Sequence, residues 1–156
     1  MSLADYSDLE QEIEEAQEPT ILPRGTEVMA RIISMMEGIS DKNGAQWYMP
    51  VFDIPDKPES LEFNDFFWDL ADRDKLEPKA ATRSLNKFKN FAAAFSVDYS
   101  RPFDWEELIG KEGWVILGVK KDEEWGDKNT VSKYVAGRKG SITVETADEN
   151  DDNAPF

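Results

Sequence analysis

The last six residues, DDNAPF, bring together groups that suit binding chemistry. Asp151 and Asp152 supply two carboxylates, Pro155 precedes the end of the chain, and Phe156 places a free main-chain carboxylate beside an aromatic ring. A ring and a carboxylate this close fit a partner pocket that holds the ring and a basic side chain that pairs with the charge. Burying the ring locally would require ordering an acidic tail, at about 1 to 2 kcal/mol per residue. We therefore predict that these four residues bind a partner protein.

The sequence offers little for catalysis. It contains no cysteine and no histidine, so the thiolate nucleophile, the commonest general base and the commonest transition-metal ligand are absent. The acidic stretch DEEWGD at residues 122–127 lacks the glycine and closing glutamate of a calcium-binding EF-hand loop. Although 33 side-chain carboxylates are present, their spacing singles out no pair. We expect a protein that is not an enzyme and that uses no metal or cofactor.

Aromatic and basic side chains suggest a different ligand, single-stranded nucleic acid. Unpaired bases stack on exposed rings, while lysine and arginine hold the phosphates. Trp125 is the clearest aromatic candidate because it lies in a polar loop, whereas an aromatic residue on a strand is more often part of the core. The candidate residues for binding single-stranded DNA are Arg31, Lys42, Trp47, Tyr48, Phe67, Lys120, Trp125, Lys128 and Lys133. A further basic stripe, Lys79, Arg83 and Lys87, is predicted to be the solvated face of an amphipathic helix.

Charge divides the chain into three parts. Residues 1–18 contain seven acidic residues and residues 145–156 contain five, with no lysine or arginine in either segment. The ends therefore account for 12 of the 15 net negative charges, and the centre is nearly balanced. Acidity normally argues against nucleic acid binding, but here that argument applies to the ends. We predict an acidic N-terminal segment over residues 1–20, one folded domain over 21–145, and a disordered acidic tail over 146–156.

Hydrophobic periodicity predicts a mainly β domain with one main helix. Strand-type alternation begins after Gly25, and the turn sequence SDKNG then connects the first strand to a second strand in a hairpin. Phe66, Trp68 and Leu70 are expected to be the buried side of a third strand because acidic residues mark its other side. The predicted elements are a short helix at 7–17, a first strand after Gly25 that leads to the turn at 40–44, further strands at 46–54, 61–70, 113–121 and 129–137, and a helix of about 17 residues after Pro78.

This order of three strands, a helix and two strands is typical of a five-stranded OB-fold barrel with the helix between strands 3 and 4. A β-sandwich or an open α+β sheet also fits the order. In an OB barrel the loops that bind oligonucleotides would be residues 37–45 and 122–128. No apolar run approaches the 18 residues of a membrane span, and the start of the chain is unlike a secretion signal. The cytoplasm is therefore the expected compartment.

The tail and two longer stretches resemble known single-stranded DNA-binding proteins. DDNAPF is similar to the acidic C-terminal tip of the bacterial proteins, in which aspartates precede a proline and a final phenylalanine. LIGKEGWVILGVKKDEEWGDKNTVSKYV at residues 108–135 and LPRGTEVMARI at 22–32 resemble the last hairpin and the opening strand of a family of small phage proteins of this type. The resemblance extends loosely over residues 22–156, and only the tail tip is a specific motif. The acidic N-terminal segment and the nearly balanced centre depart from the family pattern.

This resemblance implies an OB fold and sequence-independent binding of single-stranded DNA in the host cytoplasm, during phage DNA replication, recombination or repair. It also implies that the tail recruits proteins such as a DNA polymerase, helicase or nuclease. A barrel of this size often pairs, which suggests a homodimer. The alternative is an acidic DNA mimic or adaptor that inhibits or docks onto a nucleic-acid enzyme without binding DNA. A mimic would spread acidic residues over its folded surface, whereas here they concentrate at the ends.

Overall fold

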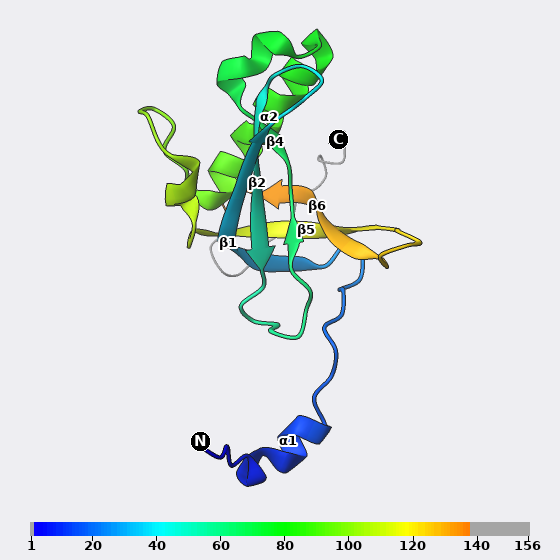
Figure 1. Cartoon of the computed structure of the whole chain (residues 1–156). Helices are drawn as coiled ribbons and strands as arrows, with labels where there is room; N and C mark the ends of the chain where they lie inside the picture. Colours follow the sequence, from blue (N-terminus) through cyan, green and yellow to red (C-terminus); the bar gives the residue numbers. More distant parts are fainter. Residues whose placement is uncertain (1, 138–156) are drawn as a thin grey trace.

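The computed structural model describes residues 2–137 and has an antiparallel sheet with one long helix (Figure 1). The sheet order is β3, β2, β1, β5, β6, and β4 also pairs with β2. The strands are β1 (Glu27–Ile39), β2 (Gln46–Asp53), β3 (Phe63–Asn64), β4 (Phe67–Trp68), β5 (Glu112–Lys120) and β6 (Lys128–Val135). The α-helices are α1 (Glu10–Glu14) and α2 (Pro78–Phe95), and the 3₁₀ helices are η1 (Ser7–Leu9), η2 (Leu70–Lys75) and η3 (Trp105–Leu108). The predicted mainly β fold with one main helix is confirmed.

Both predicted hairpins are present. β1 pairs with β2 on either side of the SDKNG turn, where Gly44 has φ +73°. β5 pairs with β6 across residues 121–127, where Gly126 has φ +85°. A glycine adopts such positive φ values without the steric cost that a side chain would add. In the second turn, one carboxylate oxygen of Asp122 also accepts hydrogen bonds from the main-chain N–H groups of Glu124 and Trp125.

The third strand differs from its prediction because it is divided in two. β3 pairs with Val51 and Phe52 of β2, and β4 pairs with Trp47 and Tyr48. Pro50, which lies between these two sets, has no N–H group to donate to a neighbouring strand. Its carbonyl oxygen instead accepts a hydrogen bond of 3.2 Å from the main-chain N–H of Asp65, in the segment between β3 and β4. The interruption of the strand therefore lies opposite the proline.

The prediction that Phe66, Trp68 and Leu70 form the buried side of this segment is also wrong. Phe67 is buried, whereas Phe66 and Trp68 are only partly covered. The prediction assumed that Asp65 marks the solvent side. Instead, its carboxylate lies 2.7 Å from the Lys87 ammonium and accepts a hydrogen bond from a tyrosine hydroxyl, so it is compensated in a largely buried place.

The core is rich in aromatic rings contributed by the sheet and by α2. The largest fully buried side chains include Phe52, Phe91 and Phe95, with the last two on one face of α2. The predicted helix is confirmed, although Leu85, expected on its buried face, is 47% exposed. Tyr134 of β6 reaches across to the other end of the sheet order, where its hydroxyl donates to Asp65.

The N-terminal segment lies apart from the sheet (Figure 1). Helical structure covers residues 7–14, a shorter stretch than predicted, and every residue from 2 to 20 is exposed. The chain joins the folded body at Thr20, whose N–H donates to the carbonyl of Glu59. Within residues 2–137, none of the helices has the length and apolar character needed to cross a membrane. The predicted tail, with Asp151, Asp152, Pro155 and Phe156, lies outside the described residues.

Candidate nucleic-acid interface

Strand register defines a second sheet face, opposite the core. On β1, Val28, Ala30 and Ile32 are buried, so the alternating residues point the other way. The register then identifies the neighbours on this face. Met36 lies opposite Met49, Trp47 lies opposite Gly38 and Trp68, Arg31 lies opposite Asp53 and Glu112, and Trp114 lies opposite Met29 and Val135. This outward face continues across β5 and β6 to the pair formed by Lys120 and Lys128.

Three aromatic side chains form a cluster at the β2–β4 end of this face. The ring centroids of Trp47 and Phe66 are 5.7 Å apart, and the rings of Phe66 and Trp68 meet edge to face at 4.9 Å. Gly38 leaves room for the Trp47 indole, because a Cβ atom on it would lie 2.5 Å from an indole carbon. We call Trp47, Phe66 and Trp68 the aromatic cluster. Its half-buried rings are held in place and still offer surface on which a base can stack.

A hollow of about 260 Å³ lies beside the cluster, between β4 and α2. Phe66, Trp68 and Arg83 are among its lining residues, and Arg83 is exposed. Lys87 also lines it, but its ammonium is committed to the carboxylate of Asp65 at 2.7 Å and to the carbonyl of Phe66 at 2.6 Å. The predicted solvated stripe on α2 is therefore confirmed for Arg83 but not for Lys87. Arg83 is the basic group that can accompany a base stacked on the cluster.

The β5–β6 hairpin carries a second group at the far end of the face. Lys120 and Lys128 lie opposite each other, and among residues 2–137 no carboxylate lies within ion-pair distance of either. Trp125, at the turn, is 82% exposed. The carboxylate of nearby Asp122 accepts hydrogen bonds from the main-chain N–H groups of Trp125 and Glu124, and these bonds, followed by the charges of Lys128 and Lys120, lower its pKa. We call Lys120, Trp125 and Lys128 the hairpin group, three candidates that the structure brings together.

The centre of the face is more balanced in charge. Arg31 is hydrogen-bonded to Asp53 through two nitrogens, at 3.2 and 2.8 Å. These hydrogen bonds and the charge of Asp53 raise the pKa of Arg31. Because Glu112 lies on its other side, Arg31 offers little net charge to a phosphate. Lys133 lies on β6 opposite Ile116, between the centre and the hairpin group.

Two of the candidate residues lie on the opposite side of the sheet. Phe67 is 3% exposed and packs on Phe91, with ring centroids 4.7 Å apart. Tyr48 stacks on Trp105 at 4.7 Å, and burial, followed by the charge of Asp69, raises its pKa to about 12. A strand presents successive side chains to opposite faces, so Tyr48 cannot share the face of its neighbour Trp47. Tyr48 and Phe67 therefore belong to the core side of the sheet and not to the outward face.

Lys42 is exposed in the turn between β1 and β2, next to the strand that carries Trp47.

Sequence reasoning missed Phe66, Trp68, Arg83 and Trp114 as members or neighbours of the outward face. The pairing of Trp47 with Trp68 across β2 and β4 would have identified the face, had the break in the third strand been recognised. Trp114 could have been identified from β5 alone, since it alternates with the buried residues Gly113 and Val115.

The chain matches no protein-family model and no curated protein sequence. Within the part of the chain that the structure describes, no group of three or more acidic side chains is placed to hold a metal ion.

Proposed function

We propose that this protein binds single-stranded DNA without sequence specificity and acts in phage DNA replication, recombination or repair within the host cytoplasm. The observation that carries the proposal is one sheet face that combines exposed aromatic surface with Lys120 and Lys128, neither of which forms an ion pair within residues 2–137. Bases would stack on the aromatic cluster and on Trp125, while Arg83, Lys120 and Lys128 hold phosphates. This combination suits unpaired bases, because a duplex hides the faces of its bases inside the stack.

The fold that we propose is an OB barrel closed between β3 and β6. The strand order and the place of α2, between β4 and β5 in the chain, support it. The hydrogen bond from the Tyr134 hydroxyl to Asp65 supports it as well, because it joins β6 to the segment after β3. In such a barrel, the turns that follow β1 and β5 would flank the bound strand.

The acidic tail has two proposed roles. In the absence of DNA, its carboxylates compete with phosphates for the lysines of the hairpin group, because the tether keeps them at high effective concentration. When DNA displaces the tail, Asp151, Asp152, Pro155 and Phe156 become available to a polymerase, helicase or nuclease. Removing residues 146–156 should then tighten binding to single strands.

Fluorescence anisotropy of labelled oligo-dT, titrated with the full-length chain at low and moderate salt, tests the function. A duplex of the same length is the control. Salt-sensitive binding to the single strand alone is the expected result. Absence of binding at low salt would contradict the proposal and favour the acidic DNA mimic or adaptor, for which inhibition of a DNA enzyme would be the next assay.

A further inference from the structure

The N-terminal helix exposes an apolar face that nothing in the described chain covers. Tyr6, Leu9 and Ile13 follow the spacing of one helical face, and all three are exposed, as is Leu3 before them. The rest of the helical stretch is strongly acidic and contains no basic residue. A helix of two turns is marginal in water without a surface to pack on. The helix therefore has the properties of a docking element.

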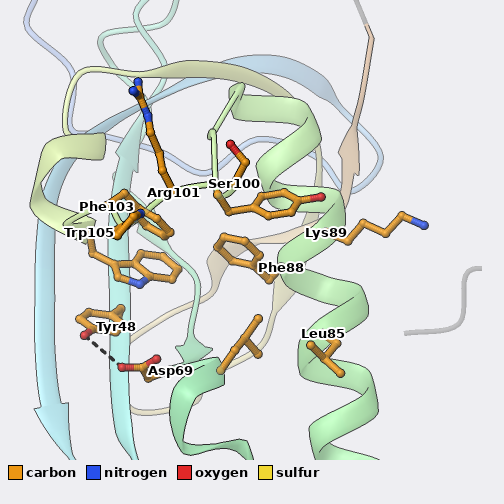
Figure 2. A pocket seen from close by; sticks show the side chains of 12 residues that line it. Tyr48, Asp69, Leu85, Phe88, Lys89, Ser100, Arg101, Phe103 and Trp105 are labelled. Atoms are coloured by element: carbon orange, nitrogen blue, oxygen red, sulfur yellow. Dashed lines mark hydrogen bonds between the residues drawn. The ribbon is translucent and has the colours of Figure 1, made fainter.

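A cleft of about 770 Å³ lies between α2, the start of η2 and residues 99–105 (Figure 2). Its lining is mostly apolar and includes Leu85, Phe88, Tyr99, Phe103 and Trp105. Leu85 and Tyr99 are 47% and 59% exposed, so the wall of the cleft offers uncovered apolar surface. Side chains of this kind fit the apolar face of a short helix.

The basic groups at the rim of the cleft, Lys89 and Arg101, favour an acidic occupant. Figure 2 shows Lys89 and Arg101 extending from the walls with their charged ends away from the rings. Arg101 lies 3.4 Å from Asp98, but its side chain is 78% exposed and can meet a second carboxylate. Asp69 already accepts hydrogen bonds from Tyr48, at 3.4 Å, and from the N–H of Ala71. An acidic helix seated on the rings would thus meet Lys89 on the α2 wall and Arg101 on the wall formed by residues 99–105.

The arrangement of the chain favours a cleft in another molecule. Figure 1 shows α1 beyond the end of the sheet, away from α2. Five residues, 15–19, join α1 to Thr20, which is fixed by its hydrogen bonds to Glu59 and Leu61. Five extended residues span at most about 18 Å. The linker therefore keeps α1 near the end of the sheet that lies away from α2 (Figure 1). We propose that the N-terminal helix of one copy docks, by Tyr6, Leu9 and Ile13, in the α2 cleft of a second copy.

Such a contact joins two different surfaces of the same chain. It builds rings or chains, or a dimer when two copies exchange their helices. In all these assemblies each copy offers one helix and one cleft. The contact needs no DNA, so its failure and the failure of the proposed function are distinguishable.

Two variants test the contact by analytical ultracentrifugation of the full-length chain without DNA. The helix variant is Leu9→Asp with Ile13→Asp, and its control is Gln11→Asp on the opposite side of the helix. The cleft variant is Leu85→Asp, and its control is Asn86→Asp, at an exposed neighbour outside the cleft lining. Circular dichroism and urea unfolding verify that each variant is folded, which the exposure of the changed side chains favours.

The wild-type chain is expected to associate as its concentration rises, and so are both controls. Each of the helix and cleft variants should associate at least about tenfold more weakly, because each removes an apolar anchor. Mixing the two variants should restore association, because the intact helix of the cleft variant can dock in the intact cleft of the helix variant. Assembly should stop at this heterodimer, because its remaining helix and its remaining cleft are both altered. A monomeric wild type, or a mixture without a heterodimer, would overturn the proposal. It would also fail if removal of residues 146–156 abolished association, because the tail would then be the occupant of the cleft.

Discussion

Replacing Asp65 with alanine should destabilise the protein far more than removing an exposed partner of an ion pair. The Asp65 carboxylate accepts hydrogen bonds from the Lys87 ammonium at 2.7 Å, from the Tyr134 hydroxyl at 2.5 Å, and from the main-chain N–H of Phe66 at 2.8 Å. Its side chain is 15% exposed, that of Lys87 is 35% exposed, and Tyr134 is buried. The substitution would leave the Lys87 ammonium without its counter-ion, with the Phe66 carbonyl as its remaining acceptor. It would also leave the buried Tyr134 hydroxyl without its acceptor.

The expected cost follows from these exposures. Breaking a fully buried ion pair costs about 3 to 5 kcal/mol, because the remaining charge is left unpaired. Lys87 keeps partial access to water, so we expect Asp65→Ala to cost about 2 to 4 kcal/mol of unfolding free energy, including the unpaired Tyr134 hydroxyl. The matched control is Asp53→Ala, which removes the partner of Arg31 on the more exposed outward face. That pair should be worth about 0.2 to 1 kcal/mol.

Urea unfolding followed by tryptophan fluorescence measures both free energies. A double variant with Lys87→Met should recover part of the loss, because it removes the unpaired charge together with its former partner. If Asp65→Ala cost no more than Asp53→Ala, the carboxylate would not be an internal acceptor. Compensation of Asp65 would then not explain why Phe67 is buried in place of Phe66 and Trp68.

Three further predictions concern other parts of the molecule. Gly38→Ala should cost about 1 to 3 kcal/mol by urea unfolding and alter the near-ultraviolet circular dichroism, because the new methyl group would collide with the indole of Trp47; an unchanged spectrum and stability would contradict this packing. Burial and the charge of Asp65 raise the pKa of Tyr134 above its usual value, so the folded state holds the phenol proton more tightly, and the unfolding free energy should fall as pH rises above about 10. Tyr134→Phe should reduce that fall. An equal fall in the variant would show that the Tyr134 phenol is not its source. Removal of residues 146–156 should strengthen oligo-dT binding in an anisotropy titration, and unchanged or weaker affinity would exclude competition by the tail.

Local sequence patterns were sufficient for most elements of the fold. The SDKNG turn, the alternation after Gly25 and the helical period after Pro78 depend on neighbouring residues, and each gave the correct element. The third strand depended on distant residues. Asp65 looks like a surface residue in its own segment, and only Lys87 and Tyr134, far along the chain, make its burial favourable.

One part of the candidate site could be predicted from neighbouring residues, and the other part depends on residues distant in the sequence. Lys120, Trp125 and Lys128 lie on one hairpin, so their proximity follows from sequence. The aromatic cluster requires the pairing of β2 with β4. A single unbroken third strand predicts Phe67, rather than Phe66 and Trp68, on the outward face. The α2 cleft is formed by segments distant in sequence, so no local pattern indicated it.

The central claim, that the outward face binds single-stranded DNA, is tested most directly by the affinity of face variants for a short oligo-dT. Trp125→Ala should weaken binding by about 1 to 3 kcal/mol, or about five- to 150-fold. Lys120→Ala with Lys128→Ala should lower the slope of log affinity against log salt by about 1.4, since each phosphate contact to a single strand contributes about 0.7. Lys89→Ala, at the α2 cleft, is the control for charge and should leave that slope unchanged. Wild-type affinity and slope in the Trp125 and lysine variants would contradict the account.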